Sequence, residues 1–155
     1  MSALLHPYKY SIEEGRYCFE TESGIKYFAY FLDMSVYAPS LYTFSFEKLE
    51  DSDQKKKPGL FVLDTICQIL QSFFEQHSNA VLFVCDSTDG RAEGRMRLFS
   101  KAFNQVNDGN YVKVDRQGHT SFYSVYSSLF FHIDNPDAET IISAFEEMCD
   151  DSLIE

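Results

Sequence analysis

The sequence has no uninterrupted apolar run of the about 20 residues that a membrane-spanning helix needs. Its first residues have neither the basic start nor the apolar length of a secretory signal. The cysteines, Cys18, Cys67, Cys85 and Cys149, lie far apart among apolar neighbours and form no Cys-x-x-Cys pair. Such spacing suits neither a zinc site nor a disulfide framework. We therefore expect a cytoplasmic protein with four small core cysteines, no metal and no cofactor.

Positive charge is also scarce. The chain has 13 Lys and Arg against 24 Asp and Glu, which gives a net charge of −11. Binding to nucleic-acid phosphates or to an anionic membrane requires concentrated Lys and Arg, so the composition argues against both partners. An acidic surface of this kind is either simply solvated or attracts a basic protein.

Tryptophan is absent, yet 15 Phe and 10 Tyr supply material for a core in a chain that is 45% hydrophobic. A chain of 155 residues has the size of one domain. Folding at this length removes roughly 70% of the unfolded surface from water. We expect a single domain over residues 1–155, with no internal repeat.

The pattern of apolar residues predicts the order β-β-β-β-α-β-α-β-β-α. Short alternating segments between Gly or Pro turns indicate a four-stranded meander in the first fifty residues. Helical spacing then predicts helices near 63–77, 91–106 and 138–149. A strand at 80–85 and a hairpin whose turn is at 116–119 lie between them. We therefore predict an α+β fold with a largely antiparallel sheet and three helices mostly on one face.

Two segments and one sheet face are expected to be exposed. Residues 50–59 form a charged loop that we expect to be mobile, and residues 150–155 form an acidic tail. The second face of the sheet would be rich in Tyr, Phe, Ser and Thr. Such a face could stack RNA bases, but the acidic charge disfavours that use. A half-covered face or a homodimer surface is the preferred interpretation.

The histidines stand apart in the sequence. His77 falls at the carboxyl end of the first predicted helix, where the helix dipole favours a structural role. His119 falls in the predicted hairpin turn, and His6 and His132 have no neighbouring partner that would complete a catalytic or metal-binding motif. No catalytic residue is therefore assigned.

Residues 86–97 depart from what a helix start needs. Arg91 opens the second predicted helix and Arg95 follows one turn later, although the helix dipole disfavours cations in the first turn by roughly 0.3–1 kcal/mol each. Gly94 costs about 1 kcal/mol relative to Ala in a helix interior. Departures of this kind tend to mark functional or strained sites. The candidate binding residues are Asp86, Asp89, Arg91, Arg95 and Arg97.

Three interpretations of this segment remain open. In the first, Asp86 and Asp89 pair with the arginines and lock the strand-to-helix turn, while Gly94 lets another element pack closely. In the second, the arginines and the helix amino terminus bind a carboxylate or phosphate of a partner. In the third, the turn is an active site. Its Asp86-x-x-Asp89 spacing is superficially similar to the Asp-x-Asp-Gly of some phosphotransferases, but is one residue longer.

The same block carries a family resemblance. The run from Val84 to Arg91, followed by Arg95-x-Arg97-Leu98-Phe99 and Ala102-Phe103, resembles the central motif of a family of small, uncharacterised bacterial proteins. Tyr42-x-Phe44 and Asp64-Thr65-Ile66 are similar too, so the resemblance spans roughly residues 8–135. It implies a one-domain cytoplasmic protein of unknown function and assigns no activity.

The carboxyl-terminal part is entirely acidic, because no Lys or Arg follows Arg116. Acids at the end of a helix oppose its dipole, so this region is either a solvated tail or a surface that masks a basic protein. The candidate interaction surface comprises Glu146, Glu147, Asp150 and Asp151. The sequence therefore favours a non-enzymatic protein-binding module, such as an inhibitor or immunity-type protein. The alternative is an enzyme that acts on an anionic small molecule at the Asp86–Arg95 turn.

Overall fold

The computed structural model describes residues 6–48, 59–86, 92–119 and 124–153. It contains three helices and a seven-stranded sheet, which confirms the α+β class. In chain order the elements are β1 (Tyr10–Glu13), β2 (Arg16–Glu20), β3 (Lys26–Asp33), β4 (Leu41–Lys48), α1 (Val62–Phe73), β5 (Ala80–Asp86), α2 (Ala92–Val106), β6 (Tyr111–His119), β7 (Ser124–His132) and α3 (Ala138–Leu153). No helix among these described residues is long and apolar enough to cross a membrane.

The strands lie in the order β1-β2-β3-β4-β5-β7-β6. The predicted amino-terminal meander is confirmed, since β1 to β4 pair antiparallel in sequence. Its first turn is made by Glu14 and Gly15, which have φ angles of 52° and 78°. Two consecutive positive φ angles match the right-handed twist of the flanking strands, which is why this tight turn works here. The sheet is thus largely antiparallel, as predicted.

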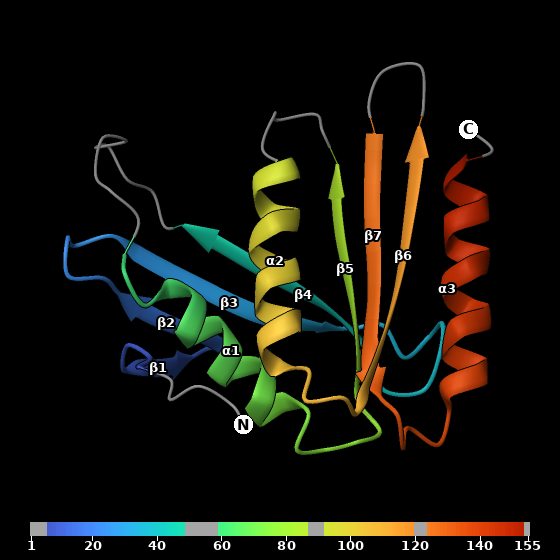
Figure 1. Cartoon of the computed structure of the whole chain (residues 1–155), viewed down its shortest axis with the longest axis horizontal. Helices are drawn as coiled ribbons and strands as arrows, with labels where there is room; N and C mark the ends of the chain where they lie inside the picture. Colours follow the sequence, from blue (N-terminus) through green and yellow to red (C-terminus); the bar gives the residue numbers. More distant parts are fainter. Residues whose placement is uncertain (1–5, 49–58, 87–91, 120–123, 154–155) are drawn as a thin grey trace.

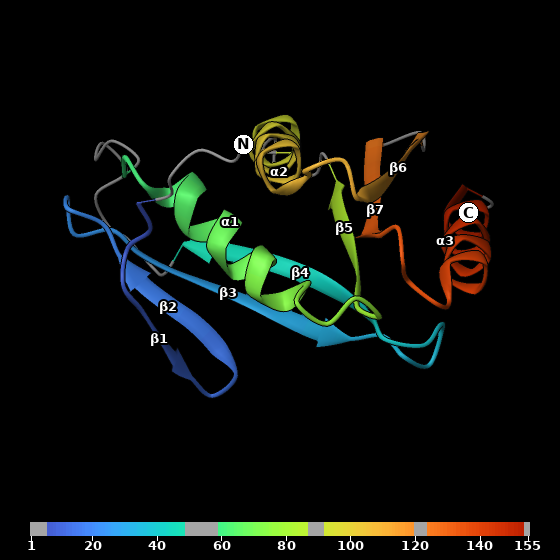
Figure 2. The same cartoon turned by 60° about the horizontal axis from the view of Figure 1, so that its bottom comes forward.

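The parallel step between β4 and β5 is short. Only Leu41, Tyr42 and Thr43 pair with β5, opposite Ala80, Val81 and Leu82. Beyond these residues the two strands diverge, so that β5, β7 and β6 run steeply across the direction of β3 and β4 (Figures 1 and 2). The sheet therefore has two parts, here called blades. One consists of β1 to β4 and the other of β5, β7 and β6, and they are joined by the three residue pairs between β4 and β5.

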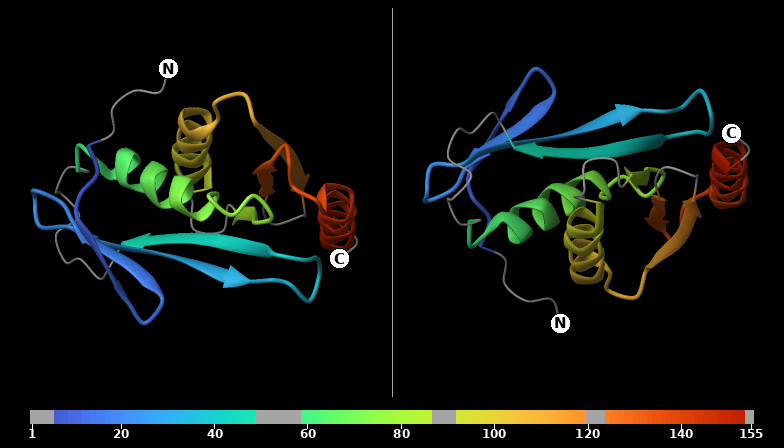
Figure 3. Two further views of the ribbon diagram at one scale, coloured as in Figure 1. Left: turned by 90° about the horizontal axis from the view of Figure 1, so that it is seen from below. Right: turned by 90° about the horizontal axis from the view of Figure 1, so that it is seen from above.

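The helices divide between the two faces of the sheet. α1 and α2 contact each other on the face that carries Phe44 and Phe83, which we call the inner face. α3 packs against β6 and β7 on the opposite, outer face, which carries Leu82 and Leu129. Two views along the sheet show α1 and α2 together on one side and α3 at the far end (Figure 3). Two of the three helices therefore share a face, as predicted, and α3 lies on the other.

Phe99 of α2 fills the angle where the blades diverge. Its ring stacks on Phe83 of β5 with centroids 3.4 Å apart and meets Phe44 of β4 edge-on at 5.2 Å. Phe103, one turn later, stacks on Phe130 of β7 at 4.4 Å. Aromatic pairs in such geometries contribute beyond their buried area. The inner core is therefore an aromatic wedge that joins both blades to α2.

A second, smaller core lies on the outer face. There Ile141 and Phe145 of α3 are buried against Leu82, Leu129 and Phe131. The turn that leads into α3 is closed by Asn135, whose side-chain oxygen accepts a hydrogen bond from the backbone N–H of Asp137 at 2.8 Å. The helix is thereby fixed at its start and held along its apolar side.

Two predicted boundaries are wrong. α1 ends at Phe73, before His77, because the Asn79 side chain donates to the Phe73 carbonyl at 2.9 Å and closes the helix end. The turn predicted at 116–119 belongs to β6, since these residues pair with Ser127 to Ser124 of β7. Long cross-strand pairing here overrides local turn propensity. α3 runs through Leu153, so the segment predicted as an acidic tail begins within this helix. The predicted 50–59 loop falls almost wholly outside the described residues.

The wedge generates a stability prediction. Phe99 is only 2% exposed, so Phe99→Ala should lower the free energy of unfolding by about 3–5 kcal/mol through the cavity that it leaves. Val36→Ala is the control, because Val36 is 87% exposed and its change should stay within about 0.5 kcal/mol. Urea denaturation followed by circular dichroism measures both. A loss below about 1 kcal/mol for Phe99→Ala would contradict the wedge as a principal contact.

Candidate functional site

The predicted strand-to-helix site is placed only in part. Asp86 is the last residue of β5, with its backbone opposite Val125 of β7, while Asp89 and Arg91 lie outside the described residues. Arg95 and Arg97 are on α2, and both side chains are exposed. The pairing or ligand-binding roles of these five residues, and the enzyme that would use them, therefore stay predictions.

Gly94 does not have the packing role predicted for it. Among the described residues, a Cβ atom added at Gly94 would meet no atom within 4 Å, so no described element approaches this part of α2 closely. The glycine is exposed near the start of the helix. The idea that it admits a neighbouring element is thus wrong. Gly94 therefore only lowers the stability of α2, through the conformational cost of a glycine in a helix.

Cations gather on the solvent side of α2. Arg97 and Lys101 are one helical turn apart, and both are exposed, as is Arg95. Residues four apart lie on the same side of a helix, so Arg97 and Lys101 form one basic strip. The described part of this strip is exposed to solvent.

The predicted acidic surface lies on α3. Glu146 and Glu147 are exposed, and Asp150 and Asp151 continue the same helix. Glu146 accepts a hydrogen bond from Arg116 Nη2 of β6 at 2.8 Å in an exposed ion pair. The structure brings these acids into one helical element, but on the outer face, away from the basic strip (Figures 1 and 3). The two predicted surfaces are therefore separate.

The aromatic outer face of β1–β4 is partly screened. Phe28 and Tyr30 are half-buried, and the guanidinium of Arg16 lies 4.9 Å from the Phe28 ring centroid and 5.8 Å from that of Tyr30. Such contacts between a cation and an aromatic ring are favourable. Leu32, farther along the same face, stays 56% exposed. The homodimer surface suggested by the sequence stays a prediction.

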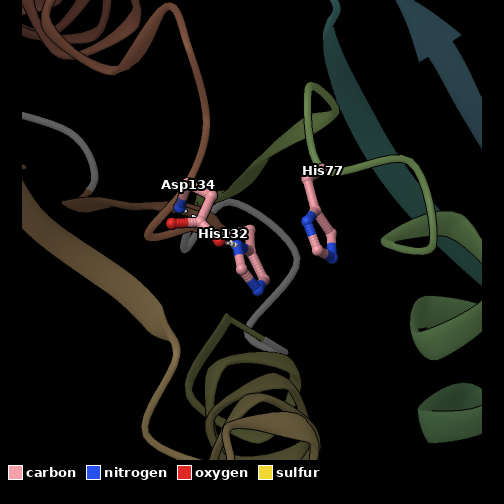
Figure 4. A group of neighbouring side chains, drawn as sticks. All are labelled: His77, His132 and Asp134. Atoms are coloured by element: carbon pink, nitrogen blue, oxygen red, sulfur yellow. Dashed lines mark hydrogen bonds and ion pairs between the residues drawn. The ribbon is translucent and has the colours of Figure 1, made fainter.

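A group of titratable side chains meets at the end of β7 (Figure 4). His77 comes from the connection between α1 and β5, His132 ends β7, and Asp134 lies in the turn before α3. One ligand atom from each lies within 4.8 Å of the others. The two imidazole rings are stacked, with centroids 3.7 Å apart and planes 6° from parallel. His132 is buried, whereas His77 and Asp134 are exposed.

Sequence reasoning missed this cluster for a clear reason. His77 and His132 are far apart in the chain and come together only because β5 pairs with β7. The one local signal is His132-x-Asp134, which is too common to indicate a site by itself. The cysteines also differ from expectation: Cys67 and Cys85 are buried, but Cys18 and Cys149 are only half-buried.

The thiol of Cys67 is not a nucleophile. Burial, assisted by the charge of Asp64, raises the pKa of Cys67 to about 12. The thiolate is the reactive form of cysteine, so this side chain stays protonated and inert at neutral pH. Asp64 itself accepts the backbone N–H of His6 at 3.0 Å, and α1 has no side-chain cap. Cys67 is therefore a core residue, and Asp64 anchors the amino-terminal segment at His6.

Asp115 on β6 accepts hydrogen bonds from one residue of its own strand and from one residue of β7. Its carboxylate accepts hydrogen bonds from Lys113 Nζ at 2.7 Å and from the hydroxyl of buried Ser128 at 2.6 Å. Burial acts to raise the pKa of Asp115, but these two donors outweigh it and hold the pKa below the usual 3.8. The ionised carboxylate is thus the form that the fold favours.

The depressed pKa of Asp115 sets an acid dependence. Its contribution to stability is present above pH 3.8 and is lost as the pH falls through the lower folded-state pKa. Asp115→Asn removes this contribution. Wild type should therefore lose more stability than the variant as the pH falls below 3.8. Urea midpoints measured at neutral pH and in steps below 3.8 test this, and equal losses in both proteins would contradict it.

Gly94→Ala should stabilise the protein by about 0.4–1 kcal/mol, because alanine restricts the unfolded chain and its methyl group meets open space. Gly59→Ala is the matched control. A Cβ there would lie 2.5 Å from Thr21 Cγ2 and from the Tyr8 hydroxyl, so that variant should lose stability. Thermal unfolding compares the two. A loss of stability in Gly94→Ala would show that this glycine is needed for the fold.

Comparison with known proteins gives a family but no relative of known role. A search of the curated proteins and a search of the solved structures both returned no match. A protein-family model matches residues 61–147, which run from the start of α1 into α3. The match is shifted from the predicted span of 8–135 and omits the meander. The motif proposed from the sequence and a bacterial origin stay predictions. The chain belongs to a family of unknown function, DUF6169.

Proposed function

We propose that this protein binds a basic protein through the acidic, solvent-facing side of α3. The observation that carries the proposal is the composition of that helix: five acids, Glu139, Glu146, Glu147, Asp150 and Asp151, occur in Ala138–Leu153 without a single Lys or Arg. A helix carboxyl terminus is the negative end of the dipole, so acids there cost stability locally. Their presence is explained if a cationic partner supplies the missing charge.

The position of α3 supports a role in binding. Its apolar side is anchored on β6 and β7 by Ile141 and Phe145, which are buried. The remainder of the helix projects at one end of the molecule (Figures 2 and 3). A rigidly held helix with an exposed charged side needs no rearrangement to receive a partner, so binding loses little conformational entropy.

The charge around α3 favours the same class of partner. Arg116 is the basic residue that contacts the helix from β6, and it pairs with Glu146. Glu139 and Glu147 are exposed, and Asp134, in the turn before the helix, has 75% of its side chain exposed. The surface therefore keeps an excess of negative charge, which would steer a positively charged protein toward it.

An inhibitor or immunity-type role is the form of binding that we infer. Such a protein needs a stable scaffold with one charged surface, and α3 on its sheet supplies both. Among the described side chains, Cys67 is protonated and Asp115 is held by Lys113 and Ser128, so neither of these two groups points to a reaction. The proposed target is thus a basic protein whose cationic surface α3 covers.

The test pairs two double variants of equal charge change. Glu146→Gln with Glu147→Gln neutralises α3, and Glu13→Gln with Glu14→Gln neutralises two exposed acids of the β1–β2 hairpin. Each protein is used to capture partners from a host lysate at low and moderate salt, and the partner is purified and titrated. The α3 variant should weaken binding by about 0.4–2 kcal/mol, as expected for two exposed charge pairs.

The control variant should bind as wild type does, and rising salt should weaken binding by wild type. Loss of the Arg116–Glu146 pair should hardly affect the fold, because exposed pairs contribute about 0–1 kcal/mol. Equal weakening in both double variants would indicate attraction by net charge alone. A captured partner that is neutral or acidic, or no partner at all, would refute the proposal.

A further inference from the structure

The distance between donor atoms in the cluster at the end of β7 suits a metal ion. His132 Nδ1 and Asp134 Oδ2 are 3.8 Å apart. Two ligand atoms bound at tetrahedral angles to Zn²⁺, with bonds of roughly 2.0–2.1 Å, are separated by about 3.4 Å. A shift of a few tenths of an ångström in the exposed Asp134 side chain would therefore give a chelating pair. The third donor, His77, is also within 4.8 Å.

The Nδ1 atom of His132 already acts as an acceptor. It accepts a hydrogen bond from the backbone N–H of Asp134 at 3.0 Å. An imidazole nitrogen that accepts a hydrogen bond carries a lone pair and no proton, which is the form that binds a metal. An ion at this nitrogen would replace that hydrogen bond of about 0.5–1.5 kcal/mol, and the Asp134 peptide, whose nitrogen is 3.0 Å from Nδ1, would have to turn aside to admit the ion.

His77 can complete the site by rotation. Its ring now stacks on that of His132, so the lone pairs of the two rings lie in two separate, nearly parallel planes and do not point toward one ion. Because His77 is exposed, its side chain is able to turn about its own bonds and bring a nitrogen toward His132 Nδ1 and Asp134. Metal binding should therefore separate the two rings.

The backbone under the site is fixed independently of any ion. Asn135 is 6% exposed, and its side-chain amide donates to the carbonyls of Ser78 and Asn79 at 3.2 and 3.5 Å. These bonds join the segment after His77 to the turn that carries Asp134. On the other side, Tyr111 contacts the His132 ring edge-on at 5.1 Å. The three donors thus project from segments that are already held together, which lowers the cost of ordering a site.

We propose that His77, His132 and Asp134 bind a divalent transition-metal ion of the Zn²⁺ class. Two imidazole nitrogens and one carboxylate oxygen are ligands that such ions prefer, whereas Mg²⁺ and Ca²⁺ prefer oxygen ligands alone. The exposure of His77 and Asp134 gives the ion a path from solvent, and a water molecule would take the fourth position. The bound ion would connect the α1–β5 segment to the turn before α3. The site shares Asp134 with the acidic surroundings of α3, but the metal binding proposed here does not depend on the function proposed for that helix.

The test is a calorimetric titration of the chelator-treated full chain with Zn²⁺ at neutral pH, where the histidines must be unprotonated to bind. Wild type should bind one ion per chain at this site, and excess Mg²⁺ should not compete. His77→Phe is the principal variant, because a phenyl ring retains the stacking on His132 but has no ligand nitrogen. It should lower the Zn²⁺ affinity roughly tenfold or more while leaving the unfolding temperature of the metal-free protein nearly unchanged.

Three further variants make the outcome specific. Asp134→Asn retains the backbone N–H but removes the anionic ligand, and it should weaken Zn²⁺ binding as well. His6→Phe removes an exposed histidine elsewhere, and Cys18→Ser removes a half-buried thiol, so both should bind as wild type. The proposal is overturned if wild type takes up no Zn²⁺, if His77→Phe binds as tightly as wild type, or if binding is lost with His6 or Cys18 instead.

Discussion

The packing of Phe99 into the angle between β4 and β5 is the contact on which the other parts of the structure depend. The two strands share only three paired residues, so backbone hydrogen bonds alone cannot fix the relative directions of the two blades. Phe99 contacts both, through Phe44 on one side and Phe83 on the other. This contact sets where α2 lies, and α2 in turn supports α1. The positions of the segment after α1 and of the end of β7 follow from the same packing.

Most of the fold was predictable because its signals are local. Alternating apolar residues and turn residues such as Glu14-Gly15 specify β1 to β4, and apolar residues at helical spacing specify α3. The errors have non-local causes. A side chain from beyond the helix, Asn79, ends α1, and pairing with β7 carries β6 through Gly118. The division of the helices between two faces also depends on strand order, which no short segment encodes.

The candidate sites also differ in whether their sequence signals are local or non-local. The acidic α3 was visible in the sequence because charge composition survives folding unchanged, and Glu146 and Glu147 are indeed exposed. The role given to Gly94 was wrong because an unfavourable local residue does not reveal whether a neighbour is present. The meeting of His77 with His132 could not be read from the sequence at all. It requires the antiparallel pairing of β5 with β7 and the position at which α1 stops.

The separation of α2 and α3 by the sheet has an electrical consequence. The amino end of α2 and the carboxyl end of α3 lie toward the same edge of the sheet, on opposite faces (Figures 1 and 3). Each terminus adds side-chain charge of the same sign as its own helix dipole: arginines on α2 and carboxylates on α3. At that edge, therefore, the helix ends give the two faces of the sheet charge of opposite sign. A charged surface that approaches this edge would attract one of the two helix ends and repel the other.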